Sequence, residues 1–456
     1  MFELKESIFR EYDIRGIVET ELTDKAVEKI ASAFAAIYVR AGAKKIALGM
    51  DGRPSSAGIK SIFIKKLTSF GLDVLDIGLV PTPVLYYSVF KYALSGGIII
   101  TASHNPAEYN GFKALLGKDA LSGEEIREIY EIARDEKFPP EKGPGVVEEA
   151  DMVSDYIEHV AADIKLEKKI KVVVDSGNGT GGITSVPLYN KIGAEVIDIF
   201  TEVDGAFPNH HPDPTKIENL QHLIAKVRET GAELGIGLDG DADRIGVVDK
   251  KGNILWGDML MVIFSRDILK DNPGRKVISE VKASEVLYSE IEKAGGIPIM
   301  WKTGHSILKK KIFEEDAIIA GEVSGHIFFN DRWFGFDDAV YSGARLLELL
   351  SRSNSSLEEI VKTIPEAFNT PEIRVDTTEE AKFRIVEEII KIFKNDYDVI
   401  DIDGARIKFP YGWALVRASN TQPSLVLRFE ADNDENLKKI RELVEPRVEE
   451  IRKRLE

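Results

Sequence analysis

The chain has 456 residues and a formal net charge of −17, because 77 acidic side chains outnumber 60 basic ones. Its 43% hydrophobic and 30% charged residues are typical of a folded globular protein, and the length predicts about three domains. The acidity argues against a nucleic-acid or membrane-surface binder, since such proteins need a basic field.

Cysteine is absent from the sequence, which excludes disulfides, thiolate metal sites and a cysteine nucleophile. The first residues are charged, and no apolar run approaches the roughly 20 residues that span a bilayer. We therefore expect a cytoplasmic protein that binds neither membranes nor nucleic acids. We also expect either a monomer or a homodimer. Glutamine occurs only at Gln221 and Gln422 while Glu, Lys and Ile abound, which predicts a heat-adapted source.

Three stretches of the chain repeat one plan of short apolar runs separated by helical patterns. In the first stretch, a helical apolar stripe over residues 27–38 is followed by Gly42, a typical helix C-terminal glycine. Short buried runs that alternate with helices predict βαβ crossovers and a mainly parallel sheet. The runs are residues 46–55, 72–80 and 96–106, then 171–180, 194–200 and 233–244, and finally 276–284, 297–306 and 317–326.

Each repeat ends with a tight turn into a fourth apolar run, as at residues 250–253, so we expect an antiparallel fourth strand. From about residue 370 the pattern changes to a helix over 379–393, three close strands and a charged final helix, which is typical of an α+β unit with an antiparallel sheet. The expected fold is three similar mixed-sheet α/β domains plus a C-terminal α+β domain. The three C-terminal strands are predicted over 399–409, 412–419 and 424–431, and the domains as 1–150, 151–252, 253–369 and 370–456.

Loops rich in polar and charged side chains follow the third run of each repeat, at the strand ends where an α/β sheet binds ligands. The second of these loops places Asp239, Asp241 and Asp243 at alternating positions before Arg244. Three carboxylates gathered around a cation suit Mg²⁺ or Ca²⁺, whereas a solvated acidic turn is the alternative. A calcium EF-hand fails because Arg244 and Lys250 stand where its glycine and glutamate belong. We therefore predict a Mg²⁺ site.

The first loop carries Ser103 and His104 before Pro106. Sequence neighbours rarely point at each other, so we do not expect these two side chains to form a nucleophile and base pair. A loop serine usually caps backbone, but a place beside the metal loop would suit phosphoryl transfer. Lys113, considered by itself, reads as a surface lysine.

Two further loops are candidates for substrate binding. Glu322, Ser324 and His326 offer polar groups for adjacent sugar hydroxyls. The segment from Arg417 to Pro423 lies between two predicted strands and forms either an anion cradle or a polar hairpin turn.

Rival interpretations use some of the same residues. The run 177–182 matches G-x-G-x-x-G, and Asp198 lies roughly where a ribose-binding acid belongs, so a dinucleotide-dependent oxidoreductase is one rival. The glycines are better explained by a close strand-to-helix turn or a phosphate site. Asp239 and Asp241 also resemble the nucleophile loop of haloacid-dehalogenase-type phosphatases, although Asp243 departs from it. A sugar-phosphate binding module without turnover is a further alternative.

Together, the motifs TASHNP, DGDADR, GEVSGH and RASNTQP, with EYDIRG at 11–16, resemble those of the α-D-phosphohexomutase superfamily over essentially the whole chain. FREYDIRG and residues 301–306 resemble the bifunctional phosphomannomutase/phosphoglucomutase branch. Val323 departs from that branch, which often has methionine there, so a phosphoglucosamine mutase is the alternative within the superfamily.

The resemblance implies an isomerase that interconverts hexose 1-phosphates and 6-phosphates through a phosphoserine and a hexose 1,6-bisphosphate. It implies that residues 1–150 carry the phosphoserine loop, 151–252 the metal loop, 253–369 the sugar-recognition loop and 370–456 a phosphate-binding lid. Ser103 would be the phosphoserine and would hold Mg²⁺ together with Asp239, Asp241 and Asp243. The remaining catalytic set would be His104, Lys113, Arg15, Arg244 and His326. The substrate would contact Glu322, Ser324, His326, Thr303, Gly304, His305, Arg417, Ser419, Asn420 and Thr421.

Overall fold

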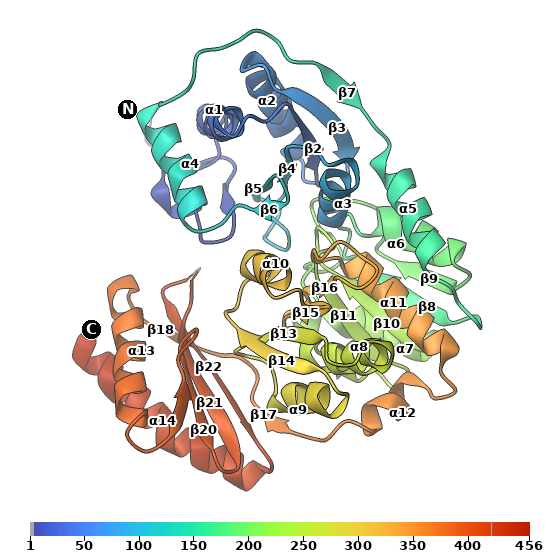
Figure 1. Cartoon of the computed structure of the whole chain (residues 1–456), viewed down its shortest axis with the longest axis vertical. Coiled ribbons are helices and arrows are strands. Elements are labelled where there is room, and N and C mark those ends of the chain that lie inside the picture. The colour runs from blue at the N-terminus through green and yellow to red at the C-terminus, as the bar shows by residue number, and fades with distance from the viewer. Residues whose placement is uncertain (1–3, 421) are drawn as a thin grey trace.

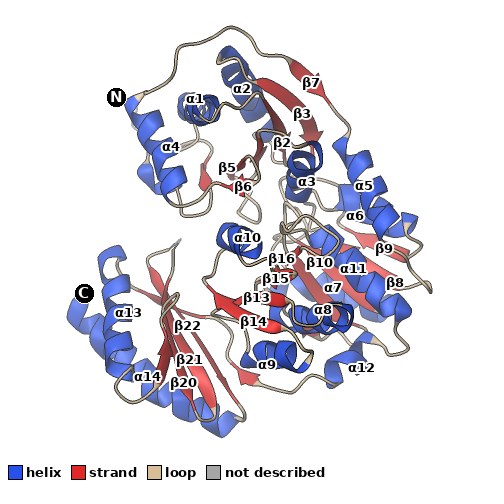
Figure 2. Ribbon diagram, in the orientation of Figure 1, coloured by secondary structure: helices blue, strands red, loops and turns tan. Residues whose placement is uncertain are grey.

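The computed structural model of the chain describes residues 4–420 and 422–456, and in it four sheets follow one another along the chain (Figure 1). Helices cover the sheets, as Figure 2 shows. Three units have mixed sheets and the last has an antiparallel sheet, which confirms the predicted fold class. Within the described residues, every helix is too short or too polar to cross a membrane.

The first sheet has the strand order β1-β5-β4-β2-β3-β7, with β6 paired to β5. β2, β3, β4 and β7 are parallel, whereas β5 runs antiparallel to β4 as predicted. β7 follows the proline-rich segment 137–145 and still pairs with β3. The elements are η1 Glu6–Ile8, β1 Ile14–Ile17, α1 Asp24–Arg40, β2 Lys45–Met50, α2 Ser56–Ser69, β3 Asp73–Leu79, α3 Thr82–Tyr92, β4 Gly96–Ile100, β5 Tyr109–Leu116, β6 Asp119–Ala120, α4 Glu124–Asp135 and β7 Val147–Glu149.

The second sheet has the order β12-β11-β10-β8-β9, and the antiparallel β11 again follows the third parallel strand. Its central strands β8 and β10 are almost wholly buried, as expected for strands covered on both faces. The elements are α5 Met152–Asp163, β8 Lys171–Asp175, α6 Gly182–Lys191, β9 Glu195–Ile199, η2 Ile217–Leu220, α7 Gln221–Thr230, β10 Leu234–Leu238, β11 Ile245–Asp249 and β12 Ile254–Leu255.

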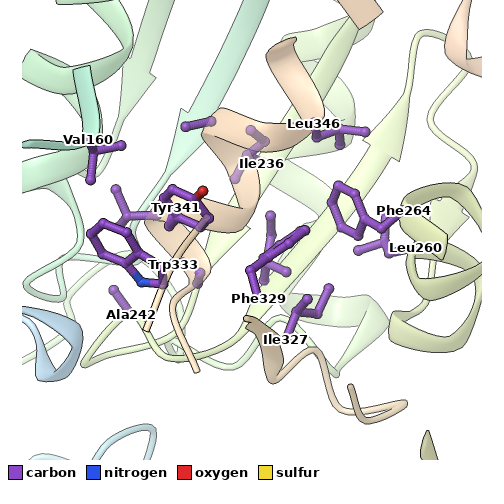
Figure 3. Close-up of a cluster of buried hydrophobic side chains, with 14 of the residues drawn as sticks. Val160, Ile236, Ala242, Leu260, Phe264, Ile327, Phe329, Trp333, Tyr341 and Leu346 are labelled. Carbon is purple, nitrogen blue, oxygen red and sulfur yellow. The ribbon is translucent and has the colours of Figure 1, made fainter. Parts of the chain in front are cut away.

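The third sheet has the order β14-β13-β15-β16, and β16 is its antiparallel strand. Helix α11 packs against β10, β11 and β16, so the second and third units share one apolar core. Figure 3 shows part of that core, where Tyr341 and Leu346 of α11 lie near Phe329 of β16 and Ile236 of β10. The elements are α8 Gly257–Asp271, β13 Lys276–Glu280, α9 Glu285–Lys293, β14 Ile297–Trp301, α10 His305–Glu314, β15 Ile319–Gly321, β16 Ile327–Phe329, α11 Ala339–Arg352 and α12 Leu357–Lys362.

The C-terminal sheet has the order β17-β22-β21-β20-β19, with β18 paired to β22. The single strand predicted over 399–409 is wrong, because residues 401–404 turn the chain between β19 and β20. Asp403-Gly404 is a hairpin signal that the continuing apolar alternation concealed, and Gly404 has φ +98°. The elements are β17 Phe368–Asn369, β18 Ile373–Asp376, α13 Glu379–Phe393, β19 Asp398–Ile400, β20 Ala405–Phe409, β21 Gly412–Ala418, β22 Ser424–Ala431 and α14 Asp434–Leu455.

Candidate active site

The loop between β4 and β5 presents Ser103 to the second unit. Ser103 has φ +51°, a left-handed conformation that non-glycine residues seldom adopt, and only 2% of it is exposed. Its Oγ donates a hydrogen bond to Asp239 Oδ2 at 2.8 Å and lies 3.0 Å from Nδ1 of His104. The prediction that Ser103 and His104 would not face each other is therefore wrong, because the left-handed turn brings the neighbouring side chains to the same side.

The aspartate loop between β10 and β11 is folded inward. Asp239, Asp241 and Asp243 are fully buried, and their carboxylates offer oxygen atoms within 4.8 Å of one another. Asp239 Oδ1 accepts hydrogen bonds from the backbone N–H groups of Asp243 and Arg244, both at 3.0 Å. The loop thus uses one oxygen of Asp239 to hold its own backbone, while the other oxygen of Asp239 faces Ser103 of the first unit.

Lys113 of β5 offsets part of the negative charge of this cluster. Its Nζ bonds Asp241 Oδ2 at 2.6 Å and also bonds Asp243 Oδ2. Only 4% of Lys113 is exposed, so the description of it as a surface lysine is wrong. Burial by itself would raise the pKa of Asp241 and of Asp243, but the ammonium of Lys113 lowers the pKa of both below the ordinary value.

The carboxylate cluster suits a hard divalent cation. Thr82 of α3 donates to Asp241 Oδ2 at 2.6 Å, but the buried Oδ1 atoms of Asp241 and Asp243 have no hydrogen-bond partner among the described residues. Buried oxygen atoms without partners are costly, and a set of carboxylate oxygens is the donor set that Mg²⁺ prefers. These residues therefore fit a magnesium ion.

Cationic and imidazole groups surround Ser103. Arg15 pairs with Asp13 and donates to Asn105 Oδ1 at 2.7 Å. Burial and the nearby Arg244 and Arg15 together lower the pKa of His104 well below its ordinary value. His104 is consequently a neutral imidazole at physiological pH.

Arg244 and His326 connect the aspartate loop to the third unit. Arg244 Nε donates to His326 Nε2 at 2.9 Å, and the other ring nitrogen of His326 lies 2.9 Å from Asp337 Oδ2. Lys309 binds the second oxygen of Asp337 at 2.8 Å. Because Nε2 accepts the hydrogen bond from Arg244, the ring proton is on Nδ1, the nitrogen on the Asp337 side.

The predicted sugar-binding residues assemble around the end of β15. Glu322 accepts a hydrogen bond from Ser324 Oγ at 2.7 Å and another from the N–H of Gly304 at 2.9 Å. His305 is buried and stacks on His326, with ring centroids 5.2 Å apart. The structure thus brings residues 303–305 into contact with the loop 321–326. The sequence alone does not predict this contact.

The C-terminal loop after β21 faces the same region. Arg417 Nε donates to Asp403 Oδ2 at 2.7 Å, and Asn420 Nδ2 donates to Oη of Tyr12 at 2.7 Å. Lys382 of α13 lies behind this loop and donates to the carbonyl of Ser419 at 2.7 Å. The predicted residue Thr421 lies outside the described residues.

Several residues of the site were missed by sequence reasoning. Tyr12 donates to the carbonyl of Thr303 at 2.8 Å and so links three units through its one hydroxyl. It lies within the motif at 11–16, which was the available signal. Thr82 and Asp337 have no local signal, since their partners, Asp241 for Thr82 and His326 and Lys309 for Asp337, lie in other segments.

The glycine run 177–182 closes against the aspartate loop. A Cβ atom at Gly179 would lie 2.6 Å from the carbonyl oxygen of Gly240, and one at Gly181 would lie 2.6 Å from Leu238. The glycines therefore permit a close approach of two loops, which explains them without a dinucleotide.

Four family models match consecutive parts of the chain, and together they include the site residues. They are the models for phosphoglucomutase/phosphomannomutase α/β/α domains I, II and III and for the C-terminal domain. They match residues 6–140, 154–252, 256–368 and 372–446. The chain belongs to the phosphoglucomutase/phosphomannomutase family.

Individual relatives agree over nearly their full length. A phosphomannomutase/phosphoglucomutase of Pseudomonas syringae is 45% identical over 96% of this chain and 94% of its own. A phosphoglucomutase of Neisseria gonorrhoeae is 45% identical over 96% of both chains. The crystal structure of a phosphoglucomutase/phosphomannomutase family protein from Burkholderia thailandensis superposes with a TM-score of 0.93 at 39% identity, covering 98% of each chain.

Proposed function

We propose that the chain is a phosphohexomutase that interconverts the 1-phosphates and 6-phosphates of mannose and glucose. The observation that carries this proposal is the hydrogen bond between Ser103 Oγ and Asp239, at the edge of a buried three-aspartate cluster. The relatives' names, phosphomannomutase/phosphoglucomutase and phosphoglucomutase, support mannose and glucose over glucosamine.

In the proposed reaction Ser103 carries a phosphoryl group. The 6-hydroxyl of a hexose 1-phosphate attacks that phosphorus, so a bond from phosphorus to sugar oxygen forms and the bond to Ser103 Oγ breaks. The sugar hydroxyl loses its proton to a nearby base, and Oγ regains one. The resulting hexose 1,6-bisphosphate then reorients within the site so that its 1-phosphate faces Ser103. Transfer of that phosphoryl group back to Ser103 leaves a hexose 6-phosphate.

The chain's own residues would stabilise the transferring group. Asp239, Asp241 and Asp243, with an oxygen on Ser103, would hold Mg²⁺, which when bound withdraws negative charge from a phosphoryl oxygen. Arg15, Lys113 and Arg244 place positive charge around Ser103, while His104 and His326 are candidates for moving protons.

The remaining predicted residues would hold the sugar and its second phosphate. Glu322 and Ser324 would read the sugar hydroxyls, beside Thr303, Gly304 and His305. Arg417, Ser419, Asn420 and Thr421 would bind the phosphate that is not reacting. One such phosphate site serves both orientations of the sugar, since each orientation presents a phosphate at the same end. A cytoplasmic location and a monomeric or dimeric state stay predictions.

A mutase assay across mannose, glucose and glucosamine phosphates, with Mg²⁺ and a trace of hexose bisphosphate, tests this proposal. Intact-mass measurement should show one phosphate on the wild-type chain and none on the Ser103→Ala variant, which should also lose activity. A sugar-phosphate binding module without turnover would bind the substrates but leave both assays negative. Tight NADH binding would instead favour an oxidoreductase.

A further inference from the structure

A single guanidinium lies behind the loop that carries Ser103. It belongs to Arg53, in the turn between β2 and α2, and its side chain is 0% exposed. Its Nε donates to Asp51 Oδ2 at 3.1 Å, and its two terminal nitrogens reach four backbone carbonyls. These are the carbonyls of Ser103 at 2.8 Å, Asn105 at 2.6 Å, Pro106 at 2.5 Å and Tyr109 at 3.0 Å.

These contacts use the whole hydrogen-bonding capacity of the side chain. An arginine has five N–H groups in a fixed plane, and here one faces a carboxylate and four face carbonyls. Arg53 therefore has no donor left for a phosphate or a sugar. Arg15 also touches this loop, but through the side chain of Asn105 and the carbonyl of Ala102, while it pairs with Asp13 beside it in the chain.

The four carbonyls converge on one point, so the loop from 103 to 109 is wrapped around the cation. This arrangement supports the left-handed conformation of Ser103, which is unfavourable for a residue other than glycine. With the carbonyl of Ser103 fixed on one side, its Oγ is directed to the other side, toward Asp239. Arg53 thus holds the carbonyl of Ser103, and Asp239 accepts the hydrogen bond of its hydroxyl.

The second unit seals this contact from water. The ring of Phe207 lies with its centroid 5.1 Å from the Arg53 guanidinium carbon. A Cβ atom at Gly52 would lie 2.1 Å from the side chain of Val203, so the segment around 203–207 packs directly on the turn that carries Arg53. In a water-free environment each arginine–carbonyl bond is harder to replace than at the surface.

We propose that Arg53 is a positioning residue for phosphoryl transfer, which holds the Ser103 loop by its carbonyls and touches no substrate. The inference rests on the proposed function, in which Ser103 carries the phosphoryl group. It predicts that a change at Arg53 slows the chemical step without weakening the grip on the sugar phosphate, whose proposed binding loops lie elsewhere.

The test uses the full-length chain with Arg53→Met and Arg53→Lys. We expect kcat to fall about 30-fold or more in the first and about tenfold in the second, because lysine keeps the charge but has only three N–H groups. KM for the sugar phosphate should stay within about threefold. In a single turnover, transfer from phosphorylated enzyme to sugar should slow by the same factor as kcat.

Arg345→Met and Arg345→Lys are matched controls. Arg345 is a buried arginine of α11 that pairs with Asp331 through two nitrogens, so its loss also removes a buried, hydrogen-bonded guanidinium. The control variants should melt at a lower temperature yet keep kcat. Should Arg53→Met fail to fold, Arg53→Lys and its kcat-to-KM split decide the question.

Two negative results are distinguishable. Equal losses of kcat in the Arg53 and Arg345 pairs, or a rise of KM with kcat unchanged, would overturn the positioning role alone. Wild-type chain that carries no phosphate on Ser103 after incubation with hexose bisphosphate would contradict the proposed function itself.

Discussion

The loop that carries Ser103 and the loop that follows Arg417 both have a buried cation behind them, but they are built differently. Arg53 binds four carbonyls of the first loop, and the second unit covers it. Lys382 binds the second loop through the carbonyls of Ser419 and Gln422, within the C-terminal unit. Each cation thus holds a loop of its own unit, but the second unit packs over Arg53, whereas the loop after Arg417 touches the first unit through the hydrogen bond of Asn420 to Tyr12.

This difference assigns separate duties to the two sides of the site. Reacting atoms must be held to a fraction of an ångström, and buried interlocking charges do this. A phosphate clamp must also admit and release its ligand, and a loop that reaches the first unit through the hydrogen bond of Asn420 to Tyr12 can do so. The sheet behind this loop is bonded to the third unit, where Arg406 and Arg428 donate to backbone carbonyls of residues 281–283. Changes on the first side should therefore reduce kcat, and changes on the second side should raise KM.

The largest effect is expected from Asp241→Asn in the carboxylate cluster. Removing one charge should cost about 10³-fold in kcat and raise the Mg²⁺ concentration needed for half-maximal rate, since a carboxylate ligand is lost. Steady-state rates across a Mg²⁺ titration measure both. Asp198→Asn, at an exposed aspartate that bonds Thr201, is the control and should behave as wild type. Unchanged Mg²⁺ dependence in Asp241→Asn would remove the cluster from the metal site.

A pH effect on stability should come from Asp338, the N-cap residue of α11, which follows Asp337 of the site in the chain. Burial raises the pKa of this carboxyl from 3.8 to about 7. The protonated acid is therefore favoured in the folded state. Its contribution to the free energy of unfolding is complete below about pH 4 and is lost as pH rises to about 7. Relative to Asp338→Asn, wild type should lose roughly 3 kcal/mol between pH 5 and pH 8.

Melting temperatures of the two proteins across this pH range test the prediction. Asp151→Asn is the matched control, because Asp151 caps α5 but its hydrogen bonds to Ser154 lower its pKa. Its difference from wild type should have the opposite slope, at lower pH. If the Asp338 difference is constant with pH, the carboxyl is not held in its acid form.

On the phosphate side, Arg417→Lys should raise KM by about 10- to 30-fold and change kcat less. A lysine cannot bond both Asp403 and a phosphate in the plane that Arg417 offers, and a charged hydrogen bond contributes about 2 kcal/mol. Initial rates at varied sugar phosphate separate the two constants. Arg441→Lys on α14, which pairs with Glu445, should leave both constants unchanged. A fall in kcat alone would break the division of duties.

The smallest effect is expected from Tyr12→Phe, which removes the hydroxyl shared by Thr303 and Asn420. Loss of these bonds should lower kcat/KM a few-fold, or about 1 kcal/mol. Tyr38→Phe loses a hydroxyl that likewise makes two hydrogen bonds, both to backbone carbonyls of the first sheet. That control should reduce the melting temperature and leave kcat/KM unchanged. An equal effect of both variants on kcat/KM would show that Tyr12 does not link the units for function.

The sequence by itself determined the repeated α/β plan, the antiparallel fourth strands and the loops that bear Ser103, Asp239 and Glu322. These features are local, because strand periodicity and the residues just after a strand lie close together in the chain. The hairpin at 401–404 is local too, but it was missed because the apolar alternation of its two strands continues across the turn and hides the Asp403-Gly404 signal.

Only the tertiary structure decided which side chains meet. Lys113 looked like a surface residue, and it became a buried partner of two aspartates because β5 lies beside the aspartate loop. Ser103 and His104 face each other because Ser103 has a positive φ angle. Packing in the folded chain sets that angle, and the sequence does not indicate it. Arg53 and Asp337 act through segments that are distant in sequence, so their burial and pairing follow from the assembled units and not from any pattern near them.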